Sequence, residues 1–268
     1  CISRFEIIAC LIAGIGNAMF HIGGGIDVLN ISNKKATLSG IFVSTGALGI
    51  FLGSKVINTN FNINYFTIFI LVLSTIALIW LYAQTKNKLN NEKIIVPSIN
   101  KKELIVIICL IVTVCIRSYV GLILSFSWKS NYILALLFVF GVILGKMFGG
   151  ILGDRFGFIK VSVCSLGLSA ILYTLAFYNS ICGILAVLLF NMTMPITLTS
   201  LANIFNNNKG LAFGLLTFAL FLGAVPVFFG YTNVLFNPIS LFIITIFSAI
   251  ILFIGLKGYN ELMEKKYD

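Results

Sequence analysis

Charged side chains are scarce in this chain: they make up 10% of its 268 residues, against roughly 25% in a soluble domain. A soluble surface needs such residues to face water, whereas 59% of this chain is hydrophobic and its mean hydropathy is +1.08. The scarcity excludes a soluble enzyme, a nucleic-acid-binding domain and a disordered chain. The predicted fold class is an all-α polytopic membrane protein, with the lipid bilayer as its surroundings.

Residues for catalysis and metal binding are also missing. The chain has one histidine, no HExxH, no Cys/His cluster, no nucleophile elbow and no nucleotide-binding glycine loop. We therefore expect no enzyme activity, no cofactor or metal, and no drive by ATP. The six cysteines include no CxxC pair, and five lie in apolar runs, where a free cysteine acts as a small buried hydrophobe. Cys1 stands where an initiator Met would be, which favours an N-terminally truncated chain.

Long apolar runs dominate what is present. A membrane-spanning helix needs about 20 mostly apolar residues, and nine such runs occur. They are Glu6–Leu29, Thr37–Ile57, Ile63–Ala83, Leu104–Phe126, Tyr132–Leu152, Ile159–Tyr178, Ile181–Ile204, Leu211–Val234 and Ile239–Leu256. Most connections are short, so neighbouring helices are expected to run antiparallel.

One connection is long, polar and basic, with Pro97 as a helix breaker. This connection is a predicted central loop, residues 84–103, which separates three spans in residues 1–83 from six spans in residues 104–258. Residues 259–268 are predicted to form a tail.

Basic residues fix the predicted orientation, because Lys and Arg concentrate in cytoplasmic loops. Of 18 basic residues, three fall on one side, Arg117 falls within a span, and all others are assigned to the opposite side. That larger set is Lys34, Lys35, Lys86, Lys88, Lys93, Lys101, Lys102, Lys146, Arg155, Lys160, Lys209, Lys257, Lys265 and Lys266. The central loop and the C-terminus are therefore predicted to be cytoplasmic, in a multi-pass protein of the cell membrane.

The loop after the fifth run carries a short motif, Gly150-x-x-x-Asp154-Arg155-x-Gly157. It resembles the GxxxDRxGRR signature of the major facilitator superfamily, although Phe158 and Ile159 replace the usual basic pair. Loop position, charge bias and the long central loop fit the same family. The resemblance implies a helical bundle of that type in which the nine spans are helices 4–12 of twelve, with helices 1–3 absent.

The resemblance also implies a gate. Asp154 would meet the start of the second run near Thr37 and Ser39, where a helix N-terminus stabilises a carboxylate, and would hold the cytoplasmic side shut. A solvated turn that obeys the charge bias is the alternative.

Glycines recur at every fourth position of the fifth run, at 141, 145, 149, 153 and 157. This small-xxx-small pattern predicts close helix packing. In the second run, Ser44–Gly49 is similar to a degenerate glycine-proline motif of the family's antiporters, with Thr45 in place of the proline. Packing explains those glycines equally well.

Polar side chains inside apolar runs are costly, so they are candidates for function. They cluster in the first, fourth and seventh runs, and the predicted cavity residues are Asn17, His21, Arg117, Asn191, Thr193 and Thr197. The resemblance assigns these runs to helices 4, 7 and 10, three of the four helices around the family's central cavity.

Three of the ionisable residues have open alternatives. Arg117 keeps its charge, so it pairs with a substrate anion, pairs with a protein acid, or snorkels toward a membrane interface. His21 is a candidate for proton coupling or a neutral residue in a helix contact. Asp27 either pairs with Lys34 or Lys35 or takes part in gating.

The expected function is secondary transport of a small solute, anionic if Arg117 binds it, by alternating access. Proton-coupled efflux is favoured, partly because Gly14–His21 is similar to a helix of fosmidomycin-resistance-type efflux proteins. The alternatives are uptake of a nutrient anion and a membrane remnant or scaffold that transports nothing. The expected partners are a small-molecule substrate and lipid, with no nucleic acid, and the full-length protein is expected to be a monomer.

Overall fold

The structure is a computed structural model that describes residues 4–57, 63–85, 99–206, 208–231 and 235–267. The described residues form helices only, which confirms the predicted all-α class. The α-helices are α1 (Arg4–Ile31), α2 (Thr37–Ile57), α3 (Ile63–Thr85), α4 (Lys101–Ile123), α5 (Tyr132–Phe156), α6 (Phe158–Leu175), α7 (Ser180–Asn191), α8 (Thr193–Ile204), α9 (Lys209–Phe228) and α10 (Pro238–Tyr267), and a 3-10 helix, η1, covers Ser127–Ser130.

Six helical segments of the described chain are long and apolar enough to cross a membrane. They are α4, α5, α6, the segment formed by α7 and α8, α9, and α10. Shorter apolar stretches lie in α2 (Thr37–Gly53) and α3 (Ile68–Trp80). The protein is therefore a membrane-embedded helical protein, and the count of nine spans stays a prediction.

The structure adds detail to two predicted elements. The run Ile181–Ile204 lies in one apolar segment, Ser180–Ile204, which is interrupted at Met192 between α7 and α8, because Pro195 has no N–H to give to the carbonyl of Asn191. Residues 259–267, predicted as a separate tail, continue α10. Most of the predicted central loop, residues 86–98, lies outside the described residues.

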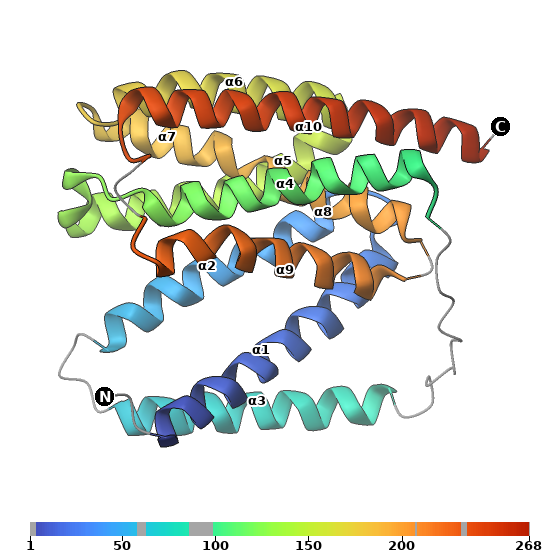
Figure 1. Cartoon of the computed structure of the whole chain (residues 1–268). Coiled ribbons are helices and arrows are strands. Elements are labelled where there is room, and N and C mark those ends of the chain that lie inside the picture. The colour runs from blue at the N-terminus through green and yellow to red at the C-terminus, as the bar shows by residue number, and fades with distance from the viewer. Residues whose placement is uncertain (1–3, 58–62, 86–98, 207, 232–234, 268) are drawn as a thin grey trace.

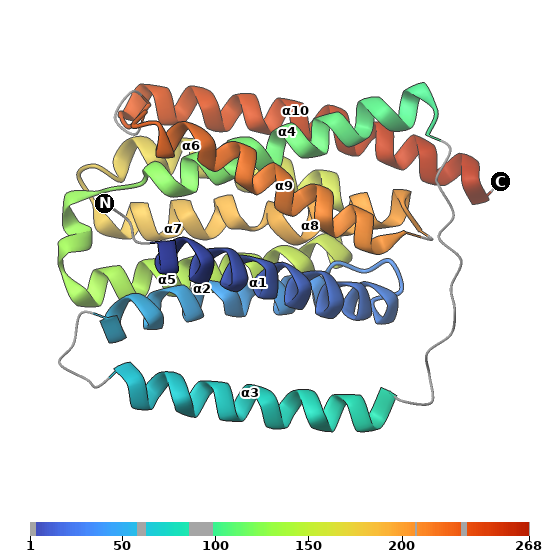
Figure 2. The same cartoon turned by 60° about the horizontal axis from the view of Figure 1, so that its bottom comes forward.

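The helices fall into two regions that differ in packing (Figure 1). In the first, α4 packs against α9 and α10, α6 against α7 and α10, and α5 against α7 and α8. In the second, α2 lies along α5 and α1 along α9, while α3 stands apart from the other helices in Figure 2.

The glycine stripe of α5 explains how closely α5 approaches α7 and α8. A Cβ added at Gly145 would collide with the carbonyl oxygen of Leu188, and one added at Gly149 would collide with the backbone of Met192. Gly141 and Gly153 are also closely covered, by Ile184 and Ile196. The predicted role in helix packing is confirmed for these four glycines.

Candidate functional site

A cavity of about 570 Å³ lies where the α1–α2 pair faces the α4–α9 helices. Four of the six predicted cavity residues line it: Asn17, His21, Arg117 and Asn191. The sequence prediction thus selected side chains from three helices that lie far apart in the chain and meet at one site. The remaining wall is mostly apolar, with Phe138 and Leu216 among its residues.

Arg117, on α4, is the most deeply buried cation of the cavity, with 7% of its surface exposed. Its Nη1 donates one hydrogen bond, of 3.2 Å, to the hydroxyl of Thr197. Among the described residues no carboxylate lines the cavity or forms an ion pair with Arg117. A guanidinium has five N–H donors, so most of its bonding capacity is left for a ligand.

Lys146 was misassigned by sequence reasoning. It was grouped with the cytoplasmic loop residues, but it lies within α5 and lines the same cavity as Arg117. Its Nζ donates a 3.2 Å hydrogen bond to the carbonyl of Val43 on α2. Lys146 fell inside the predicted run Tyr132–Leu152, but its place near the loop motif led to its being counted with the basic residues of the cytoplasmic side.

His21 stands among aromatic rings at the cavity wall. Its ring stacks on Phe213 of α9, with centroids 6.2 Å apart, and contacts Phe42 of α2 edge-on at 6.4 Å. It is half-buried and lines the cavity together with Asn17, one turn earlier on α1. The position gives His21 contact with both regions of the protein.

The two predicted threonines do not line the cavity. Thr193 is fully buried, and its hydroxyl donates to the carbonyl of Phe190. Thr197 lies behind Arg117 and accepts its hydrogen bond, so it positions the guanidinium. Asn191, which does line the cavity, donates its amide to the carbonyl of Val187 one turn back.

Asp154 makes the contact with α2 that the family resemblance implies. Its carboxylate accepts hydrogen bonds from the backbone N–H groups of Ala36, at 2.7 Å, and Thr37, at 2.8 Å, and from the Thr37 hydroxyl. The first N–H groups of a helix have no partner within that helix, and the helix dipole favours a negative charge there. A residue of α5 thus caps α2.

The glycines of the loop motif have separate structural reasons. Gly150 lies so close to Ala36 that an added Cβ would collide with its carbonyl oxygen. Gly157 ends α5 with a φ of +94°, a conformation that glycine adopts without strain. Arg155 is exposed and lies over the ring of Phe156.

Further hydrogen bonds join the two regions at the end of the bundle where α2 begins and α5 finishes, here called the Asp154 end. Ser39 bonds Thr199 between hydroxyls at 2.9 Å, and Lys209 Nζ donates to the carbonyl of Leu29 at 3.0 Å. This end of the cavity is therefore closed by polar contacts. Asp27 is exposed on α1, away from these contacts, and its proposed pairing or gating role stays a prediction.

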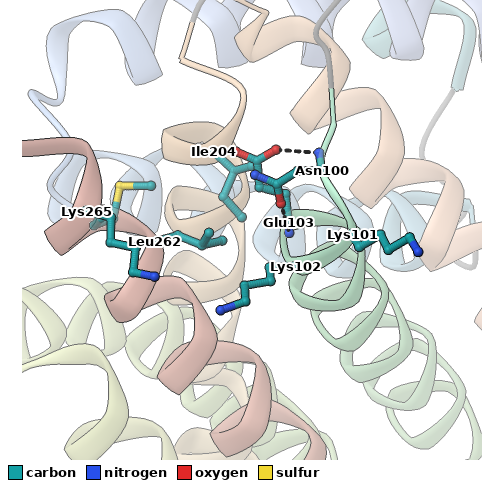
Figure 3. Close-up of a pocket in the computed structure, with 8 residues that line it drawn as sticks. Asn100, Lys101, Lys102, Glu103, Ile204, Leu262 and Lys265 are labelled. Atoms are coloured by element: carbon teal, nitrogen blue, oxygen red, sulfur yellow. Dashed lines mark hydrogen bonds between the residues drawn. The ribbon is translucent and has the colours of Figure 1, made fainter.

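A second cavity, of about 550 Å³, lies outside the predicted site, between the start of α4 and the ends of α8 and α10 (Figure 3). Asn100 and Glu103 form a capping box there that begins α4. Lys102 and Lys265 also line it, with Leu262 on α10. No predicted site residue belongs to this cavity.

No family model, curated protein or solved structure matches the chain. The cavity and its contacts therefore carry the functional argument.

Proposed function

We propose that this protein is a secondary transporter of the major facilitator type that moves a small anion through the cavity between its two regions. The observation that carries the proposal is the charge of that cavity: Arg117 and Lys146 line it without an acidic side chain from the described residues. A charge held within a membrane protein is costly unless it is paired or faces water. An anionic substrate supplies the missing partner.

The contacts at the Asp154 end support alternating access. Asp154, Ser39 and Lys209 hold the α1–α2 pair against the other helices at that end. In alternating access, two halves rock around a central site so that it opens to one side at a time. We propose that this arrangement is the state closed at the Asp154 end, which the charge bias of the loops assigns to the cytoplasm.

Proton-coupled efflux is the proposed mode, with His21 as the coupling group. Histidine is the side chain that proteins use most often to take up and release protons near neutral pH, and His21 contacts aromatic rings of both α2 and α9. Protonation of His21 would add positive charge to a cavity that already holds two cations, so it would change anion affinity and the contact between the two regions together.

The test is counterflow in proteoliposomes, with radiolabelled acetate, lactate, succinate and phosphate as probes. Arg117→Gln and His21→Ala are expected to abolish transport while the protein still inserts normally. Lys160→Gln is the matched control, because Lys160 is exposed on α6 and lies outside the cavity. Transport by both cavity variants at the rate of the unmodified protein would refute the cavity assignment.

Coupling is tested separately by imposing a pH gradient across the same vesicles. We expect the rate of anion movement to follow the gradient in the unmodified protein. A rate that does not depend on the gradient would remove His21 as the coupling group while leaving the cavity assignment in place.

A scaffold without transport is the competing proposal, and the weak attachment of α3 is the observation that favours it. Every described side chain from Ile68 to Trp80 is exposed, so this helix offers a free apolar surface. The counterflow assay separates the two: a scaffold moves none of the anions in vesicles that contain correctly inserted protein.

A further inference from the structure

We infer that the substrate of the cavity is an organic dianion, with one negative group held by Arg117 and the other by Lys146; this rests on the proposed transport function. The two cations come from different helices, α4 and α5, and line one cavity of about 570 Å³. Sequence reasoning offered Arg117 alone, so the second charge is a finding of the structure.

Charge balance is the first argument. With Arg117 and Lys146 both protonated, the described lining carries two positive charges and no negative one. A monoanion would neutralise one of them and leave the other without a partner. Leaving one buried charge unpaired is strongly unfavourable, and the two cations also repel each other. Two negative charges on one ligand remove both costs.

Unused hydrogen-bond donors are the second argument. Within the part of the chain that the structure describes, Arg117 donates one hydrogen bond, to a neutral hydroxyl, and Lys146 donates one, to a neutral carbonyl, each at 3.2 Å. Neither bond is a charge pair. A guanidinium presents a planar fork that matches the two oxygens of a carboxylate or phosphate, whereas an ammonium binds as a point charge. The site therefore suits one group bound in a fork at Arg117 and a second group at Lys146.

The apolar part of the wall shows why the dianion is organic. Leu122, Phe138, Val142 and Leu216 line the same cavity, and a volume of several hundred Å³ is typical of sites for small organic ligands. A carbon chain between the charged groups would cover this wall, which sulfate or free phosphate cannot do. Dicarboxylates, and organic phosphates that also carry a carboxylate, share this chemistry.

Lys146 also links the ligand to the closed state. Its bond to the carbonyl of Val43 joins α5 to α2, across the boundary between the two regions. A dianion that attracts the ammonium competes with this bond, so binding weakens one contact that holds the regions together. Binding and opening are then coupled through one side chain.

The experiment measures binding to the purified, detergent-solubilised protein with ligands of one size and three charges: succinate, its monoamide succinamate, and neutral succinamide. Glutarate and its monoamide glutaramate form a second pair that differs by one charge. We expect each dianion to bind about tenfold or more tightly than its monoanionic partner, because a close desolvated charge pair exceeds that factor. Succinamide is expected not to bind.

The variants identify the second cation. Lys146→Gln is expected to reduce the preference for dianion over monoanion to about one while leaving monoanion binding in place, and Arg117→Gln is expected to weaken both. Lys160→Gln serves as the control for charge outside the cavity. Variants enter the comparison only if their melting temperature in detergent matches that of the unmodified protein. Lys146→Arg keeps the positive charge, so it is expected to keep the preference for dianion over monoanion.

Each of the other possible outcomes refutes one defined part of the proposal. Equal binding of dianion and monoanion, alongside anion counterflow in vesicles, refutes the dianion and keeps the proposed function. A preference that survives in Lys146→Gln refutes the role of Lys146. Absence of binding by all five ligands together with absence of counterflow refutes the transport function itself.

Discussion

The α4–α10 helices and the α1–α3 helices are built from equally apolar sequence but pack very differently. Among the residues whose burial the structure describes, the connected hydrophobic core takes only Leu29 and Val43 from before Lys101. The α4–α10 helices enclose their own core, and in their closest contacts glycines pack against the backbone of a neighbouring helix. By contrast, the described side chains of α3 are exposed from Ile68 to Trp80.

The comparison separates stability from conformational change. Tight packing between helices has few alternative arrangements, so the α4–α10 region is expected to move as a unit. The α1–α2 pair is attached by the close α2–α5 approach at Gly40 and Gly150 and by hydrogen bonds of the Asp154 end. These contacts form the boundary along which a transporter of this type would open.

Separating the regions should give the largest effect. We expect residues 99–268, expressed alone, to insert into membranes and to unfold cooperatively in detergent, because this piece keeps nearly all of the core. Residues 1–98 alone should give no cooperative transition. Thermal unfolding followed by circular dichroism measures both. The two regions are not distinct if the 99–268 piece aggregates while the whole chain, prepared in the same detergent, does not.

Glycine substitution should give the next largest effect. Gly145→Ala is expected to lower the free energy of unfolding by about 1–3 kcal/mol, because its Cβ would collide with the carbonyl oxygen of Leu188, a backbone atom within helix α7. Gly167→Ala, on α6, is the control: no atom lies within 4 Å of its added Cβ, and alanine favours a helix over glycine by about 0.5–1 kcal/mol. Denaturant titration in mixed micelles compares them. An equal loss of unfolding free energy in Gly145→Ala and Gly167→Ala would show that the close helix packing at the glycine stripe adds no stability of its own.

Much of the fold could be predicted from the sequence, because apolar runs and helix length are local properties. The break at Met192 follows from Pro195, because a proline inside an apolar run removes a helical hydrogen bond. The continuation of α10 through residues 259–267 could not be predicted from hydropathy, since a polar helix end looks like a loop on that measure.

The site was predicted in part for the same reason. Asn17, His21, Arg117 and Asn191 are polar residues in apolar surroundings, and this local contrast selected them. Lys146 has the same contrast but stands near a loop motif, so it was assigned by its neighbours in sequence. Its role depends on α2 lying beside α5, which only the tertiary structure gives.

Asp154→Asn should give the smallest effect and should be confined to the boundary between the regions. The amide keeps the size of the side chain but loses the charge that the α2 N-terminus favours, so the cap on Ala36 and Thr37 weakens. A lost cap costs about 0.5–2 kcal/mol, which corresponds to roughly 2- to 30-fold faster amide exchange at these two residues. Hydrogen–deuterium exchange measures this in peptides that cover residues 32–42, with the α7–α8 peptides as an internal reference.

Arg155→Gln is the matched control for Asp154→Asn, because Arg155 is the next residue and is also charged, but lies over the ring of Phe156. Faster exchange in the α7–α8 peptides as well would mean that Asp154 stabilises the whole bundle, and the boundary would then not be a separate point of opening.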